Sequence, residues 1–233
     1  MVFVSPVFVF IFLPATLALY MLACLTRKTA VKNLALLFCS LVFYSWGGVK
    51  YTILLMISTV VNYVFGRLLE GEKRRKMVLV LSVIYNVGIL FVFKYFNFFM
   101  DTTSSIAQAL HMDWSVAVPA ITLPIGISFF TFQIMSYVFD VYLRKVETQK
   151  NILDLALYIM LFPQLIAGPI VRYIDVNQEI KERHTDSAMI HDGISRFIIG
   201  FNKKIFLANG MGYMADAVFA KVNEVNTPYA WLG

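Results

Sequence analysis

Charged residues are scarce in this sequence of 233 residues. They make up 15% of the chain, against about 25% in an average soluble domain, while hydrophobic residues make up 59%. A soluble fold of this size could not cover so much apolar surface with so few charges, so the composition excludes a soluble globular domain. It also excludes disordered and collagen-like chains, which contain few large apolar residues. We therefore predict a membrane protein with several spans.

Cysteine and histidine are rare as well. The two cysteines, Cys24 and Cys39, lie within apolar runs and lack the spacing of metal ligands. We expect buried thiols there, and neither a disulfide framework nor a metal site. None of the three histidines, His111, His184 and His191, lies within an apolar run, and we expect a surface or structural role for each.

The few charges are mostly basic and unevenly distributed. The sequence has 20 Lys and Arg against 14 Asp and Glu, a net charge of +6. In a soluble protein this balance could indicate nucleic-acid binding, but here the basic residues cluster between apolar runs, as they do in cytoplasmic loops. We expect no nucleic acid as a partner, and a multi-pass membrane protein with its N-terminus outside. The three basic segments expected on the cytoplasmic side are 27–32, 67–76 and 144–150.

Apolar runs of about 20 residues, the length that crosses a bilayer, alternate with these basic segments. Residues 2–25, 77–100 and 118–142 are expected to be single spans. Residues 34–69 are too long for one span and contain a Gly-Gly pair, so we expect two antiparallel helices joined by a glycine turn. The polar segment 101–117 is expected to lie outside or along the outer surface.

The last part of the chain departs from simple spans. Residues 152–171 are apolar but contain two prolines and a glycine, so we expect a broken or re-entrant helix, surrounded by protein or a wet cavity. A charged connector, 172–191, should lead into an interfacial helix over 191–208, where apolar residues recur at helical spacing. The expected fold is all-α, a polytopic transmembrane helical bundle with 1–233 as a single transmembrane domain.

The densest group of polar residues within an apolar run lies in 118–142. Four of them share one face of a helix through spacings of three, four and seven: Gln133, Ser136, Tyr137 and Asp140. Polar groups are costly in a membrane, so this face should point into the bundle. Two interpretations stay open, namely hydrogen bonds between helices and the lining of a substrate path.

Three segments carry motifs in a recognisable order. They are Leu123 to Tyr142; Phe162-Pro163-Gln164-Leu165-Ile166-Ala167-Gly168-Pro169-Ile170 with Arg172; and Gly193, Arg196-Phe197, Gly200, Lys203-Lys204 and Ala208-Asn209. Together they resemble the membrane-bound O-acyltransferases. The resemblance is greatest to the bacterial branch with the alginate O-acetylation membrane protein and the D-alanyl transfer protein of teichoic acids. Tyr44-Ser45-Trp46-Gly47 also fits that branch.

This resemblance implies acyl transfer. In the family, an acyl group on a cytoplasmic thioester carrier passes through a tunnel in the helical bundle to an extracytoplasmic protein or polysaccharide, with a membrane-embedded histidine as the base. The donor would be acetyl-CoA or an acyl carrier, and alginate is one candidate acceptor. No bound cofactor is implied. The Trp-rich motif that holds the family histidine is not found here, so no residue of this chain is assigned a catalytic role.

Family members are much longer than this chain, so we expect an N-terminal portion that is inactive by itself. The candidates for a substrate path are Gln133, Ser136, Tyr137, Asp140, Gln164 and Arg172. The candidates for binding a phosphate-bearing donor or anionic lipid headgroups are Arg196, Lys203 and Lys204.

Two other functions stay open. Broken helices and polar residues at membrane depth also suit a transporter or channel, although the sequence has no related halves. A non-catalytic membrane subunit that docks partners would suit a native chain that ends at Gly233.

Overall fold

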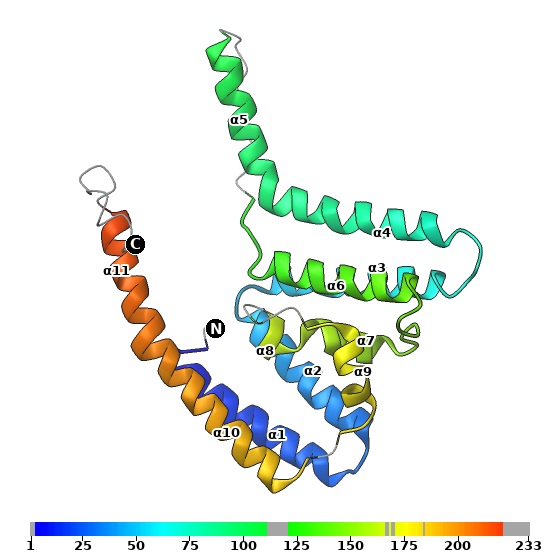
Figure 1. Cartoon of the computed structure of the whole chain (residues 1–233), viewed down its shortest axis with the longest axis vertical. Helices are drawn as coiled ribbons and strands as arrows, with labels where there is room; N and C mark the ends of the chain where they lie inside the picture. The colour runs from blue at the N-terminus through cyan, green and yellow to red at the C-terminus, as the bar shows by residue number, and fades with distance from the viewer. Residues whose placement is uncertain (1–2, 111–120, 166–167, 169–170, 184, 221–233) are drawn as a thin grey trace. The chain divides into compact units, whose positions relative to one another are not determined.

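The computed structural model describes residues 3–110, 121–165, 168, 171–183 and 185–220, and the regular secondary structure of these residues is all helical (Figure 1). They form two compact units: Phe12–Arg183 make the first, and Val2–Ile11 with His184–Gly233 make the second. The described helices long and apolar enough to cross a membrane are Phe8–Leu25, Val49–Leu68 and Arg75–Ala109. The expected all-α membrane bundle is thereby confirmed, whereas the single domain stays a prediction.

The first unit contains most of the buried residues. Its helices are α1 (Leu13–Leu25), α2 (Thr29–Ser45), α3 (Val49–Leu68), α4 (Arg75–Leu90), the π-helical turn η2 (Phe91–Tyr95), α5 (Phe96–Ala109), α6 (Ile127–Tyr142), α7 (Ile152–Met160), α8 (Phe162–Leu165) and α9 (Tyr173–Lys181). α6 packs against both α3 and α4, and α7 packs against α2 and α3. The buried core accordingly centres on α6 and α7.

The expected helical hairpin over 34–69 is confirmed as α2 and α3. The turn between them contains Gly48, whose φ of 130° lies in a region that side-chain-bearing residues rarely adopt. α2 has 17 residues, fewer than the roughly 20 that a span perpendicular to the bilayer needs. The Tyr44 hydroxyl near its end donates to the Ile125 carbonyl oxygen at 2.9 Å, which joins α2 to the segment ahead of α6.

The helix that begins at α4 is longer than the sequence predicted. The helix expected over 77–100 continues through η2 and α5 to Ala109, whereas the location of 101–109 outside or along the outer surface stays a prediction. The hydroxyls of Thr102 and Ser105 in this extension donate to the carbonyls of Phe98 and Asp101, each at 2.8 Å, so these polar side chains are satisfied by their own helix. Figure 1 shows a bend between α4 and α5, where the π-helical turn interrupts the regular bonding.

α6 is shorter than the predicted span over 118–142. It begins at Ile127, directly after Gly126 in the left-handed conformation with a φ of 77°. Pro124 supplies no backbone N–H, so the segment ahead of Gly126 does not continue the helix. Residues 118–120 lie outside the described residues.

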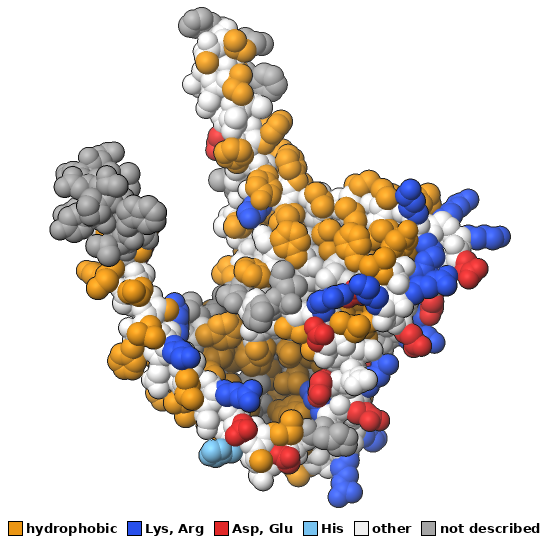
Figure 2. Space-filling model, in the orientation of Figure 1, with side chains coloured by type: hydrophobic (Ala, Val, Ile, Leu, Met, Phe, Trp, Pro, Cys, Tyr) orange, Lys and Arg blue, Asp and Glu red, His pale blue; other side chains and the backbone are white. Residues whose placement is uncertain are grey.

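Arg75, at the start of α4, ties together the ends of two other helices. Its guanidinium donates to the carbonyls of Val141 and Tyr142 at 3.0 and 2.7 Å, and to that of Leu69 at 2.8 Å. These carbonyls end α6 and follow α3, where helix dipoles attract cations. Figure 2 shows Lys and Arg side chains gathered around the turn between α3 and α4. Arg75 belongs to the basic segment 67–76 that was expected to be a cytoplasmic loop, and the structure shows that its side chain joins helices.

Asn33 makes a second junction, between α2, α7 and α9. Its Nδ2 donates to Asp154 Oδ1 at 2.8 Å and to the Ile180 carbonyl at 3.0 Å. Its Oδ1 accepts a hydrogen bond from Arg183. Because Asn33 is buried, these bonds fix the level of α7 and α9 against the start of α2.

The two buried asparagines Asn62 of α3 and Asn86 of α4 form a reciprocal pair. Asn86 Nδ2 donates to Asn62 Oδ1 at 2.7 Å, and Asn62 Nδ2 donates to Asn86 Oδ1 at 3.2 Å. Ser82 Oγ donates to the same Asn62 oxygen at 3.3 Å. Each amide therefore satisfies the other in an apolar helix pair.

The second unit contains most of the π-helical turn η1 (Phe8–Phe12). It also contains three helices from the end of the described chain, namely α10 (Ser187–Asn202), the π-helical turn η3 (Lys203–Ala208) and α11 (Asn209–Phe219). The Asp186 side chain caps α10 by accepting from Met189 N at 2.7 Å. The predicted bounds need two corrections. α9 is a helix inside the expected connector 172–191, and the helix expected over 191–208 begins at Ser187 and continues to Phe219.

Replacing Asn62 by Ala should destabilise the protein by about 1–2 kcal/mol, because the buried Asn86 Oδ1 then loses its donor, while Asn86 Nδ2 keeps the Ser82 carbonyl. The double replacement N62L/N86L should cost less than the sum of N62L and N86L measured separately. Thermal unfolding in detergent micelles measures all four variants. Additive effects would contradict the pairing.

Candidate functional site

The helix break between α7 and α8 is the centre of the candidate site. In a continuous helix the Phe162 N–H would bond the Tyr158 carbonyl oxygen, but the chain turns away at Leu161, whose ψ is 116°. The Phe162 N–H instead donates to Ser40 Oγ of α2 at 3.1 Å. The Tyr158 carbonyl accepts two side-chain amides, from Gln133 at 2.8 Å and Gln164 at 2.5 Å. The predicted break in 152–171 is thus confirmed, and its backbone groups are satisfied by other helices.

The polar face predicted on α6 points into the bundle. Gln133, Tyr137 and Asp140 are buried, and Ser136 is half-buried. Ser136 Oγ donates to the Gln133 carbonyl at 2.8 Å, within the same helix. The Tyr137 hydroxyl accepts from Gln149 N at 3.1 Å. All four candidates therefore make bonds inside the protein, and their role on a substrate path stays a prediction.

Asp140 and Arg172 form an ion pair between α6 and the residue ahead of α9. Arg172 Nη2 lies 2.5 Å from Asp140 Oδ1, with side-chain exposures of 47% and 3%. The second carboxylate oxygen, Oδ2, is buried and has no hydrogen-bond partner among the described residues. A buried carboxylate depends on its cation, so this pair fixes the chain that returns from the helix break.

Three tyrosines pack edge to face beside this pair. The ring of Tyr173 lies 5.0 Å from that of Tyr137 and 5.2 Å from that of Tyr158, with interplanar angles of 76° and 75°. Burial raises the pKa of the Tyr173 hydroxyl above its usual range, so this group stays protonated at neutral pH. It donates to Asn177 Oδ1 and accepts from Gln149 Nε2, each at 2.9 Å.

A small cavity adjoins the helix break. Its volume is about 210 Å³, and its walls come from α2, the break and α9. Tyr158 and Gln164 line it on one side, and Glu179 and Arg183 on the other. A polar edge in an otherwise apolar cavity is typical of sites that orient a small ligand.

The other three candidates lie in the second unit. Arg196 belongs to α10, whereas Lys203 and Lys204 begin the π-helical turn η3. The described part of this unit has no buried residue on α10, η3 or α11. The side chain of His191 in α10 is 82% exposed, and its Nδ1 lies 3.8 Å from Asp192 Oδ1. His111 and His184 lie outside the described residues.

Several residues of the site were not found from the sequence. Ser40, Gln149 and Tyr173 lie far from Gln133 in sequence, yet all contribute bonds around the break. Ser40 is a polar residue within an apolar run, and that signal was available in principle. Gln149 follows a charged segment, and nothing in its neighbours indicates that it is buried.

Curated relatives match the chain over its whole length. A probable alginate O-acetylase AlgI of Pseudomonas aeruginosa is 38% identical over 237 residues, which cover 100% of this chain and 44% of the relative. The protein of that name from Azotobacter vinelandii is 37% identical, with 46% covered. A peptidoglycan O-acetyltransferase of Helicobacter pylori is 29% identical, with 49% covered. No protein-family model matches the chain, and no solved structure matches it significantly.

These relatives confirm the resemblance that the motifs predicted, because the curated proteins that match the whole chain are named as O-acetylases or O-acetyltransferases. More narrowly, the chain is a homologue of the alginate O-acetylases. It spans less than half the length of each of these relatives.

Replacing Arg172 by Gln should destabilise the protein by about 1–3 kcal/mol, because the Asp140 carboxylate then stays buried without its cation. The expected loss is smaller than for a fully buried pair, since Arg172 is half-exposed. The double replacement D140N/R172Q should recover most of the loss. Thermal unfolding in micelles, with the exposed Lys181→Gln as control, measures the effect. An R172Q variant as stable as K181Q would contradict the account.

Proposed function

We propose that this chain forms part of a membrane-bound O-acyltransferase that acetylates an extracytoplasmic polysaccharide such as alginate. The donor is a thioester on the cytoplasmic side of the inner membrane, either acetyl-CoA or an acetylated carrier. The chain contributes helices to the wall of the path between donor and acceptor. Acetyl transfer also depends on residues that correspond to the part of the relatives outside the match with this chain.

One observation carries the proposal. The first two segments that resemble the family, 123–142 and 162–172, meet in space although they are separate in sequence. Gln133 and Gln164 bond the same carbonyl oxygen, and Asp140 pairs with Arg172. A polar centre built from both motifs within an apolar bundle favours a site over an ordinary packing contact.

The chemistry is transfer of acetyl from sulfur to oxygen. The acceptor hydroxyl attacks the thioester carbonyl, a base takes the hydroxyl proton, and the thiol leaves as the new ester forms. The resemblance assigns the base to a membrane-embedded histidine. His191, the histidine within the described residues, is exposed, so we assign no base to it. The proposed contribution of this chain is the polar lining near Tyr158 and Gln164.

Deletion of the gene in the bacterium that carries it tests the proposal. The secreted or envelope polysaccharide should lose its ester-linked acetyl while polymer yield stays unchanged, and the full gene should restore the acetyl. Base-released acetate per sugar residue measures the effect. Unchanged acetylation in the deletion strain would contradict an acetylase and leave the transporter or docking functions.

Within that strain, Gln164→Leu should lower acetylation by about tenfold, which corresponds to about 1.4 kcal/mol, the scale of one lost hydrogen bond. The physical reason is that Tyr158 loses one of its two amide donors and the adjoining cavity loses its polar edge. Gln178→Leu is the matched control, since Gln178 is exposed on α9. Membrane levels of both variants are compared by immunoblot. Equal acetylation by the two variants at equal levels would contradict a role for Gln164.

A further inference from the structure

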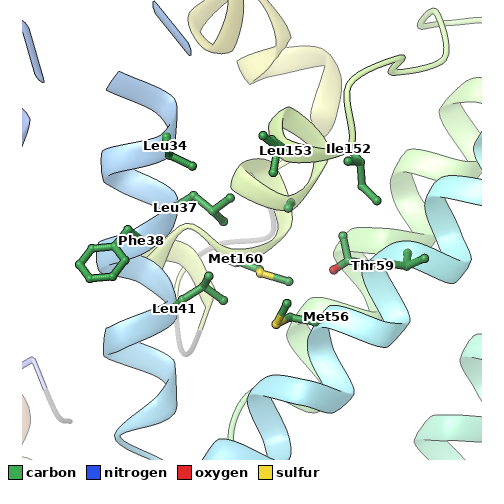
Figure 3. A pocket seen from close by; sticks show the side chains of 11 residues that line it. Leu34, Leu37, Phe38, Leu41, Met56, Thr59, Ile152, Leu153 and Met160 are labelled. Atoms are coloured by element: carbon green, nitrogen blue, oxygen red, sulfur yellow. The ribbon is translucent and has the colours of Figure 1, made fainter. Parts of the chain in front are cut away.

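An apolar groove opens on the surface of the first unit between α2, α3 and α7. Its volume is about 320 Å³. In Figure 3, side chains of α2 such as Leu37 face Met56 and Thr59 of α3, and Met160 of α7 lies between them. Thr59 is the one lining residue with a polar side chain, and its hydroxyl already donates to the Leu55 carbonyl at 2.8 Å. The groove therefore offers an occupant apolar contacts and no unsatisfied polar group.

The groove has a buried floor and an open rim. Leu37 and Met160 are buried, whereas Leu34, Phe38 and Val60 along the rim are exposed. Exposed apolar rims of this kind are covered by other apolar groups in a membrane protein. α3 is one of the helices suited to cross the membrane, so the groove faces the hydrocarbon region along at least that helix.

One end of the groove meets polar and basic groups. The Tyr63 hydroxyl, one turn beyond Thr59 and Val60 on α3, donates to the Lys150 carbonyl at 2.7 Å. Lys150 is exposed and lies just ahead of α7, whose residues Ile152 and Leu153 line the groove. Lys150, which also lines a neighbouring cavity with Glu70 and Glu147, therefore lies where the apolar walls of α3 and α7 stop.

The start of α2 adds two further cations at the same end. The bond from Asn33 to Asp154 places the start of α2 level with the start of α7. The exposed Arg27 and Lys28 directly precede α2. The nearby Asp154 keeps its negative charge, because its oxygens accept only from the neutral amides of Asn33 and Asn151. Arg27, Lys28 and Lys150 outnumber this carboxylate, so the net charge of these four residues is positive.

We infer that this groove binds one acyl chain of an anionic phospholipid, with the phosphate at the basic end formed by Arg27, Lys28 and Lys150. A slender unbranched chain is favoured over a helix, because a groove of about 320 Å³ cannot enclose one turn of a helix about 10–12 Å across, roughly 400 Å³. Basic residues at a membrane surface attract anionic lipid headgroups, which favours a phosphate at this end. The inference goes beyond the proposed function, since it needs no acetyl transfer.

Native mass spectrometry of the purified protein, released from nanodiscs of equal phosphatidylglycerol and phosphatidylcholine, tests the inference. We expect one retained phospholipid, and phosphatidylglycerol as its main class. Val60→Trp fills the groove from its exposed rim and should reduce retention at least about tenfold. Val80→Trp on α4 is the matched control and should retain the lipid, because Val80 is 46% exposed, against 47% for Val60, and lines none of the described cavities.

A second variant separates the headgroup from the acyl chain. The triple replacement of Arg27, Lys28 and Lys150 by Gln should keep one retained lipid but abolish the preference for phosphatidylglycerol. Equal retention by V60W and V80W would overturn the groove as the site. Retention of phosphatidylcholine and phosphatidylglycerol in equal amounts by the unmodified protein would overturn the anionic headgroup. A dimer without lipid would show instead that a second copy covers the groove.

Discussion

The Tyr158 carbonyl oxygen is the group on which the arrangement of the first unit depends. Once the chain turns away at Leu161, this oxygen and the Phe162 N–H lose the bond that a straight helix would give them. In a bundle that excludes water, each unsatisfied backbone group costs several kcal/mol. Gln133, Gln164 and Ser40 supply the replacement bonds from α6, α8 and α2. The prolines favour the break, and side chains from these three helices satisfy the backbone groups that it frees.

The charged groups of the first unit reinforce the same arrangement at its edges. Arg172 pairs with the buried Asp140, so the chain leaving the break is held against α6. Arg75 donates to carbonyls that end α6 and follow α3, where a cation is favoured by the helix dipole. The outer surfaces of α3 and α4 remain apolar, as a bilayer requires. Polar bonds thus join the helices inside the unit, while its outer surface is apolar and suited to lipid. This separation explains how a polar centre can exist inside an apolar bundle.

Patterns of composition and spacing predicted much of this fold. Hydrophobic runs predicted α2 and α3, the prolines predicted the break, and spacings of three and four placed Gln133, Tyr137 and Asp140 on one inward face. Helix bounds were less predictable, because polar side chains such as Thr102 bond back to their own helix, so a polar segment does not mark the end of α5. Partners distant in sequence could not be predicted at all. No residue near Ser40 in the sequence indicates that its hydroxyl accepts from the Phe162 N–H, because that bond depends on the packing of α2 against α8.

Hydrogen exchange at the Phe162 amide tests most directly whether side chains hold the helix break. The account predicts slow exchange in the unmodified protein, because this buried N–H donates to Ser40 Oγ. Ser40→Ala should accelerate exchange at that amide by about fivefold or more, the equivalent of one lost hydrogen bond. Cys39→Ala, at the neighbouring buried position, should leave it unchanged. Equal exchange in the S40A and C39A variants would contradict the account, since the break would then be maintained without the Ser40 hydroxyl.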